Sequence, residues 1–160
     1  MAQKKAHEVD RWLARPDTAA AVVLIYGPDR GLVSERAQKF ARTTGLPLDD
    51  PFTVIKLDGS EIEKQEGRLS DEVRTVPMFA TKRLVWLRNA GNSAALTSEV
   101  KALLDEPPTD CIVLIEGGDM KKSAPLRVAV ERSGAGMALP CYADDGRGLD
   151  GLIEEVMASA

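Results

Sequence analysis

Residues 27–34, GPDRGLVS, have the spacing of a loop that binds nucleotide phosphates. A Walker A loop reads GxxxxGK followed by Ser or Thr; its backbone N–H groups surround the phosphates, its lysine meets the β- and γ-phosphate oxygens, and its hydroxyl binds Mg²⁺. Aligned without gaps, the segment keeps Gly27 and the hydroxyl of Ser34, but Leu32 replaces the second glycine and Val33 replaces the lysine. Because the charge aimed at the γ-phosphate is lost, we expect a degenerate, non-functional Walker A loop.

Catalysis in such proteins also needs acidic residues at the end of a neighbouring strand, to hold Mg²⁺ and to position the attacking water. The corresponding stretch reads RLVWLRNAG, residues 83–91, and has Arg88 and Asn89 where the acids are needed. A cation there would repel Mg²⁺, so the Walker B motif is also predicted to be degenerate. Glu116 is the only alternative acid at the end of a strand-like run. The two losses together favour a scaffold without NTP hydrolysis, and weak nucleotide binding stays open as an alternative.

The composition fits one soluble globular domain. The chain has 160 residues, of which 44% are hydrophobic and 29% charged, and its formal net charge is -4. A module that binds DNA or RNA by itself normally carries a basic surplus, and no apolar run approaches the roughly 20 residues of a transmembrane helix. Cys111 and Cys141 are expected to be reduced structural thiols. His7 is the single histidine, which leaves no material for a histidine triad or a zinc site, and we expect no metal.

Strand-like apolar runs alternate with segments of helical spacing. The expected strands are Val22–Tyr26, Thr53–Leu57, Leu84–Leu87, Ile112–Ile115 and Met137–Leu139. The expected helical stripes are Val33, Ala37, Phe40 and Ala41; Leu69, Val73 and Val76; Leu96, Val100, Leu103 and Leu104; and Leu126, Ala129 and Val130. Such alternation predicts an α/β fold with an open parallel five-stranded sheet and helices on both faces.

The last residues have a helical pattern of their own. Leu149, Leu152, Ile153 and Val156 lie at helical spacing after a run of Asp and Gly. A helix of this kind needs a partner to pack against. We therefore expect residues 1–143 to form one domain and residues 144–160 to be the start of a second, truncated one.

Three blocks of the chain, taken in order, resemble one protein family. They are VLIYGPDRGLVSERAQKFA (residues 23–41), DEVRTVPMFATKRLVWLRNAG (residues 71–91) and DCIVLIEGGDMKKSAPLR (residues 110–127). Together they resemble the N-terminal, AAA+-like domain of the delta subunit of the bacterial DNA polymerase III clamp loader. The first block matches a strand, turn and helix without a working Walker A loop, and the second matches an apolar element that leads into a basic strand.

The resemblance implies a non-catalytic role in DNA replication. Members of this family have no ATPase activity and need no cofactor; they bind the β sliding clamp and help to open the ring for loading onto primed DNA. They are accessory subunits of the DNA polymerase (nucleotidyltransferase) holoenzyme in the cytoplasm, beside the tau/gamma and delta prime subunits, and meet DNA only within the assembled loader. The second domain that the tail would begin is, in this family, the lid.

The family's clamp contact is an apolar pair, usually Leu-Phe, which falls here on Met78 and Phe79. Val76 and Pro77 precede the pair, and Pro77 disfavours helix at Val76, so the pair is expected at a helix end. Burying both side chains in a partner would contribute roughly 3–6 kcal/mol before the cost of association. The alternative is that Met78 and Phe79 cap the core of their own domain.

The surroundings of the pair are less regular than in the family. Arg74, Lys82 and Arg83 flank it, and cations there would suit an acidic partner surface. Clamp-binding peptides commonly have a glutamine where this chain has Arg74 or Thr75, so the role of Arg74 is an open point. The other functional hypotheses are a divergent P-loop NTPase and a domain that senses a nucleotide without hydrolysing it.

Overall fold

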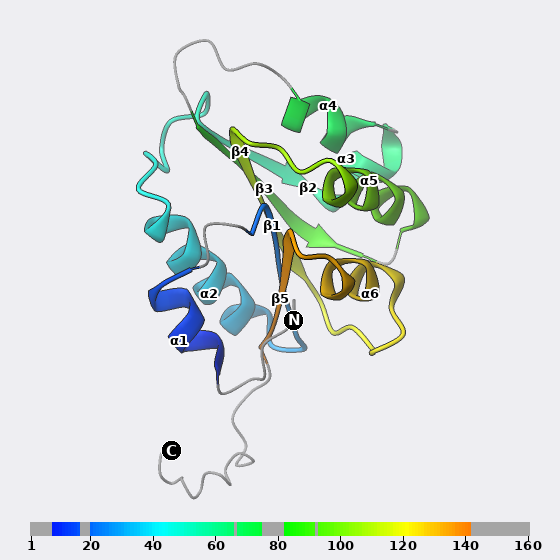
Figure 1. The fold of residues 1–160 in the computed structure, drawn as a ribbon, viewed down its shortest axis with the longest axis horizontal. Coiled ribbons are helices and arrows are strands. Elements are labelled where there is room, and N and C mark those ends of the chain that lie inside the picture. Colours follow the sequence, from blue (N-terminus) through cyan, green and yellow to red (C-terminus); the bar gives the residue numbers. More distant parts are fainter. Residues whose placement is uncertain (1–7, 17–19, 66, 75–81, 92, 142–160) are drawn as a thin grey trace, which may run out of the picture.

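The computed structural model describes residues 8–16, 20–65, 67–74, 82–91 and 93–141. These residues form a five-stranded, entirely parallel sheet with the strand order β2-β3-β4-β1-β5 (Figure 1). The strands are β1 (Val22–Tyr26), β2 (Val54–Asp58), β3 (Arg83–Ala90), β4 (Cys111–Gly117) and β5 (Gly136–Pro140). All five predicted strands are confirmed, each within a few residues of its expected limits.

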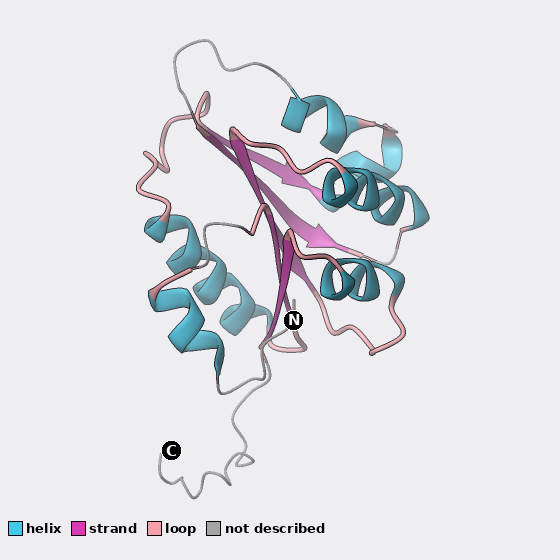
Figure 2. Ribbon diagram, in the orientation of Figure 1, coloured by secondary structure: helices cyan, strands magenta, loops and turns pink. Residues whose placement is uncertain are grey.

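Helices cover both faces of the sheet (Figure 2). They are α1 (Val9–Ala14), α2 (Arg30–Thr43), α3 (Gly59–Lys64), α4 (Arg68–Arg74), α5 (Ala94–Asp105) and α6 (Pro125–Arg132). One core cluster joins α1 and α2 to one face, and a second joins α3, α4, α5 and α6 to the other. Every residue of β1 is buried because both of its faces are covered, which accounts for its unbroken apolar run.

The four predicted helical stripes fall on α2, α4, α5 and α6, and their members among the described residues face the core or its margin. Val76, the last member of the α4 stripe, lies outside the described residues, as does the 144–160 segment expected to start a second domain. Helices α1 and α3 were not predicted. No helix among the described residues combines the length and the apolar character needed to cross a membrane.

Different elements meet at the two ends of the sheet. At its carboxyl end, β3 and β4 finish beside the first turn of α2. At its amino end, β3 starts beside the last turn of α4, since the Arg83 guanidinium bonds to Glu72 of that helix. The amino end also carries the turn before β2, where Phe52 is 74% exposed.

Candidate functional site

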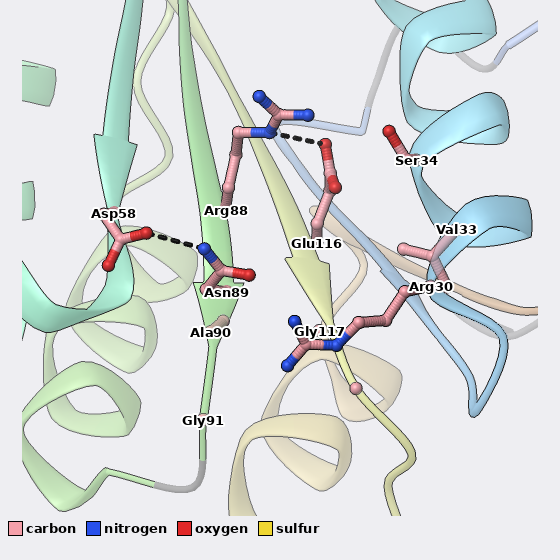
Figure 3. A pocket seen from close by; sticks show the side chains of 11 residues that line it. Arg30, Val33, Ser34, Asp58, Arg88, Asn89, Ala90, Gly91, Glu116 and Gly117 are labelled. Atoms are coloured by element: carbon pink, nitrogen blue, oxygen red, sulfur yellow. Dashed lines mark hydrogen bonds and ion pairs between the residues drawn. The ribbon is translucent and has the colours of Figure 1, made fainter.

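A cavity of about 520 Å³ lies at the carboxyl end of the sheet, between the ends of β2, β3 and β4 and the start of α2 (Figure 3). It brings together residues that the sequence placed in two separate motifs: Arg30, Val33 and Ser34 from the Walker A segment, and Arg88 and Asn89 from the Walker B segment. Its lining also includes Asp58, Glu116, Ala90 and the glycines at the ends of β3 and β4. This is the position in which open α/β sheets usually bind their ligands.

The connection from β1 to α2 is short. Only Gly27, Pro28 and Asp29 separate the strand from the helix, which begins at Arg30. A Walker A loop has four residues between its two glycines, and they wrap around the phosphates. Here the helix begins within that segment, so Leu32 and Val33 lie in helical structure and not in an open loop. The helical stripe that was predicted to begin at Val33 is confirmed, but the alignment did not indicate that the helix begins as early as Arg30.

Three of the N–H groups at this turn and at the start of α2 have acceptors within the protein. The N–H of Gly27 donates to the carbonyl of Gly118 (3.1 Å), and the N–H of Val33 donates to the carbonyl of Asp29 (3.0 Å). The Asp29 carboxylate caps α2 by accepting from the N–H of Leu32 (3.1 Å). A carboxylate at this position also repels an anion from the helix N-terminus, where a phosphate would otherwise be attracted.

Packing closes the turn further. A Cβ built on Gly27 would lie 1.9 Å from the carbonyl oxygen of Cys141, so only glycine fits between the end of β1 and the end of β5. Val33, the residue in the lysine position, is 3% exposed and packs in the core beneath α2. Val33 therefore contributes a small apolar surface, and no charge, to the wall of the cavity.

The acid at the end of β4 is paired with the cation at the end of β3. Arg88 Nε lies 3.5 Å from Glu116 Oε2, and the indole N–H of Trp86 donates to the same oxygen. The Arg88 guanidinium also lies over the Trp86 ring, 5.7 Å from its centroid. Figure 3 shows Arg88 and Glu116 pointing toward each other above the cavity. Arg88, in the Walker B position, therefore neutralises the alternative acid at the end of the neighbouring strand.

Asn89 has a similar role on the other side of β3. Its side-chain amide donates to Asp58 Oδ1 (2.6 Å), and its backbone is left-handed, with φ 57°, at an irregularity of the β3–β4 pairing. Hydrogen bonds from Asn89 and then from Ser60 lower the pKa of Asp58 to about 2. Asp58 also caps α3 through a capping box with Glu61. Both carboxylates of the cavity are thus satisfied by the chain itself.

Arg30 and Ser34 are the groups that remain oriented toward the cavity, and Arg30 extends toward Gly117 (Figure 3). Among the described residues, no group of three His, Cys, Asp or Glu side chains could hold a metal ion. Cys111 and Cys141 are free and buried, and burial raises the pKa of each thiol to about 11. The cavity has the location of a nucleotide site, and its main polar groups are bonded to one another.

The apolar segment predicted to bind a partner lies outside the described residues, and this holds for Val76, Pro77, Met78 and Phe79. Its flanks are described. Lys82 is exposed, but Arg83 is only 3% exposed and bonds to Glu72, so the expectation that Arg83 is a surface cation for an acidic partner was wrong.

Arg74, the residue in the usual glutamine position, has a partner within the domain. It donates to the carbonyl of Glu106 (2.8 Å), just after α5. Sequence reasoning also missed Glu99 of α5, which accepts from two backbone N–H groups at the start of α4. These residues are 29 and 32 positions away from Glu99, and no local sequence pattern signals such a contact.

Comparison with known families decides the relationship. The sequence model for the delta subunit of DNA polymerase III matches residues 23–128, which is more than half of the chain. The chain belongs to the DNA polymerase III delta subunit family. The matched range of this delta-family chain includes β1, β2, β3 and β4, both halves of the carboxyl-end cavity, and α4. No curated protein sequence matches the chain.

Solved structures agree on the fold. The delta-family chain is similar to the DNA clamp loader delta protein (YqeN) of Bacillus subtilis, with a TM-score of 0.68 and 14% identity over 97% of this chain and 48% of that one. It is also similar to a DNA polymerase III gamma subunit-related protein of Thermotoga maritima, with a TM-score of 0.55 and 12% identity over 95% of this chain and 50% of that one.

A RuvB variant of Thermotoga maritima is a further match, with a TM-score of 0.53 and 12% identity over 96% of this chain and 49% of that one. The predicted AAA+-like fold is confirmed by these neighbours together with the five-stranded parallel sheet. The delta-family chain spans about half the length of the structures that it matches.

Proposed function

We propose that this chain is the clamp-binding part of a non-catalytic clamp-loader subunit. It binds the β sliding clamp and helps to open the ring for loading onto primed DNA, beside tau/gamma and delta prime subunits in a cytoplasmic loader. It meets DNA only within that assembly and carries no ATPase activity of its own. The observation that carries the proposal is the family match over residues 23–128.

The state of the carboxyl-end cavity supports the absence of ATPase activity. Arg88 and Glu116 neutralise each other where a Mg²⁺ site would need unpaired acids, and the Asp29 carboxylate occupies the helix N-terminus where phosphates would bind. Hydrolysis of a nucleotide requires both a bound metal and a stabilised γ-phosphate. In this chain the groups at the corresponding positions bond to other groups of the protein: Arg88 to Glu116, and Asp29 to the N–H of Leu32.

We place the clamp contact on Met78 and Phe79, with Val76 and Pro77 beside them. The segment joins the last turn of α4 to the start of β3, and its neighbours Arg74 and Arg83 are both fixed to the domain. An apolar pair on such a base can enter a hydrophobic pocket of a partner, which is the usual form of an interface hot spot. Methionine fills about the same volume as leucine and adapts well to a pocket.

The test is a binding titration with purified sliding clamp. Phe79→Ala is expected to weaken binding by about 2 kcal/mol, which is roughly 30-fold, and Met78→Ala by less, because the aromatic side chain buries more surface. Phe52→Ala is the matched control: it makes the same chemical change at an exposed phenylalanine on the same end of the sheet. The control is expected to bind like the wild type.

Equal affinity of wild type and the Met78→Ala, Phe79→Ala double variant would show that the contact is elsewhere. If Phe52→Ala reduced binding as strongly as Phe79→Ala, the loss could not be assigned to a contact made by Met78 and Phe79 in particular. Circular dichroism spectra of all variants must match that of the wild type, so that a loss of binding is not a loss of fold.

A nucleotide-sensing domain is the second candidate, favoured by the cavity itself with Arg30 and Ser34 on its wall. Calorimetry with ATP and Mg²⁺ separates the two. Micromolar binding without hydrolysis would support the sensor, and binding with turnover would support a divergent P-loop NTPase. The proposed clamp-loader subunit shows neither.

A further inference from the structure

We infer that Glu99 is a positioning residue for the proposed clamp contact, because it fixes the start of the helix that precedes residues 75–81 to the body of the domain. The inference rests on the proposed function, in which those residues carry the apolar pair. It adds a residue that lies far from the pair in sequence and acts through α4.

Helix α4 cannot be stable by itself. It has seven residues, Arg68–Arg74, and isolated helices of this length do not form in water. Leu69 and Val73 bury its apolar side in the core, but two contacts one turn apart leave the tilt and the ends of a short helix weakly defined. Its N-terminal N–H groups also need acceptors.

Glu99 of α5 supplies those acceptors. Its Oε1 accepts from the N–H of Ser70 (2.9 Å) and its Oε2 accepts from the N–H of Gly67 (3.2 Å). A capping box satisfies the same two positions with side chains of the helix itself. Here one carboxylate of a neighbouring helix satisfies both, so the cap is at the same time a link between α4 and α5. Glu99 is 8% exposed, and a hydrogen bond is electrostatically stronger in the low dielectric of the interior than in water.

The other end of α4 is held from two sides. Arg83, at the start of β3, donates to the carbonyl of Glu72 (2.8 Å) and to its carboxylate (2.6 Å). Burial alone would raise the pKa of Glu72, but hydrogen bonds from Arg68 and Arg83 bring it below its ordinary value. Arg74 reaches the carbonyl of Glu106 at the end of α5. The last turn of α4 and the first residue of β3 are therefore both fixed to the body of the domain.

Fixing α4 reduces the cost of binding a partner next to it. When only a fraction of the molecules has the binding-competent arrangement, the apparent affinity is the intrinsic affinity multiplied by that fraction. Loss of the Glu99 link is expected to loosen the first turn of α4, and so to lower the fraction of molecules in which the proposed contact is competent to bind. The effect falls on the association rate, because Glu99 itself does not touch the partner.

Two variants of Glu99 test this in the whole chain. Glu99→Gln keeps one acceptor oxygen, and Glu99→Leu keeps the bulk but leaves both N–H groups without an acceptor. For Glu99→Leu we expect about a tenfold loss of affinity for purified sliding clamp, and for Glu99→Gln a smaller loss. The loss is expected in the association rate with the dissociation rate unchanged, and amide exchange in residues 67–74 is expected to accelerate in the same order.

Glu131→Gln is the matched control. Glu131 of α6 accepts a hydrogen bond from Arg127, one turn away, at 2.7 Å. Glu131→Gln therefore also replaces a hydrogen-bonded carboxylate by an amide, but on a helix that does not lead into residues 75–81. This variant is expected to bind the clamp with wild-type rates and to leave exchange in residues 67–74 unchanged.

The outcomes separate the inference from the proposed function. If the wild-type chain does not bind the clamp, the proposed function fails, and the positioning role fails with it. If the wild type binds and Glu99→Leu binds equally well while α4 exchanges faster, only the positioning role is overturned. Unchanged exchange in α4 would show that Glu99 does not hold the helix, and a loss confined to the dissociation rate would show that Glu99 touches the partner directly.

Discussion

The two ends of the sheet use charged side chains in opposite ways. At the carboxyl end, Arg88, Glu116 and Asp58 bond to neighbours within the cavity and leave little for a ligand. At the amino end, Glu99 and Arg83 bond to the backbone and side chains of α4 and hold a short helix in place. The carboxyl end is where this class of sheet normally binds ligands, and here it is the end whose groups are consumed internally.

This difference teaches that a cavity can keep the position of a nucleotide site while its charged groups are paired with one another. The residue types that replaced the catalytic ones form contacts of their own: the cation in the Walker B position pairs with an acid, and the apolar residue in the lysine position enters the core. The carboxyl end has become part of the scaffold. The amino end, with its anchored helix, is the end on which we propose that a partner binds.

The largest effect on stability is expected from adding a methyl group at the carboxyl end of the sheet, where β1 and β5 end close together. Gly27→Ala places a methyl group 1.9 Å from the Cys141 carbonyl, and the backbone must shift to admit it. We expect a loss of about 3 kcal/mol in the free energy of unfolding, measured by denaturant titration. Gly91→Ala, where nothing lies within 4 Å of the added atom, should change stability by less than about 0.5 kcal/mol. Similar values for the two variants would contradict the close approach of β1 and β5.

Restoring the missing lysine should not restore a nucleotide site. Val33→Lys buries an ammonium group in the core beneath α2 and is expected to cost about 2 kcal/mol of stability, while the N–H groups of the turn keep their internal acceptors. Gln38→Lys, at an exposed position of the same helix, should be neutral. Calorimetry is expected to detect no ATP binding by either variant. Micromolar binding of ATP with Mg²⁺ by Val33→Lys would mean that the turn before α2 can still bind phosphates.

A smaller effect is expected from Asp58, and it depends on pH. The folded-state pKa of this carboxyl is about 2, lowered from 3.8, so its stabilising contribution is complete above pH 3.8 and is lost as the pH falls through 2. Asp58→Asn should therefore be less stable than the wild type at neutral pH, and the difference should shrink in acid unfolding curves. Asp49→Asn, at an exposed position, should show no such trend. A difference that grows on acidification would contradict the proposed bonds to Asn89 and Ser60.

The smallest effect concerns the two thiols, one near each end of the sheet. With a pKa of about 11, each is ionised in about one molecule in a thousand at pH 8, and both are buried. Iodoacetamide should modify neither Cys111 nor Cys141 in the native chain and both in denaturant, as read by mass spectrometry. Rapid modification of one thiol alone would identify the end of the sheet that opens more readily.

The strands and their parallel arrangement could be predicted from the sequence because most of them, β1, β4 and β5 above all, are buried on both faces, which produces runs such as residues 22–26. The two missed helices were missed for different reasons. Helix α1 has six residues, too few for a periodic pattern, and it is held by packing, with Trp12 stacked on Phe40 at 5.9 Å. Helix α3 starts with Gly and Ser, which disfavour helix, but Asp58 and Glu61 form a capping box whose spacing could have indicated it.

The candidate site was predictable only in its residue types. The alignment of residues 27–34 correctly identified what is missing, but it could not show that α2 begins at Arg30 or that Asp29 caps it, since both depend on how the turn packs against Cys141 and Gly118. The pairing of Arg88 with Glu116 crosses between two strands and has no local signature. The same is true of Glu99, whose two partners come from a different helix.

One measurement tests the central claim most directly, namely that the amino end of the sheet binds the partner while the carboxyl end serves as scaffold. It is a titration of the wild-type chain with purified sliding clamp, carried out with and without ATP and Mg²⁺. We predict saturable binding with the same dissociation constant under both conditions. Absence of binding, or an affinity that changes when ATP and Mg²⁺ are added, would contradict it.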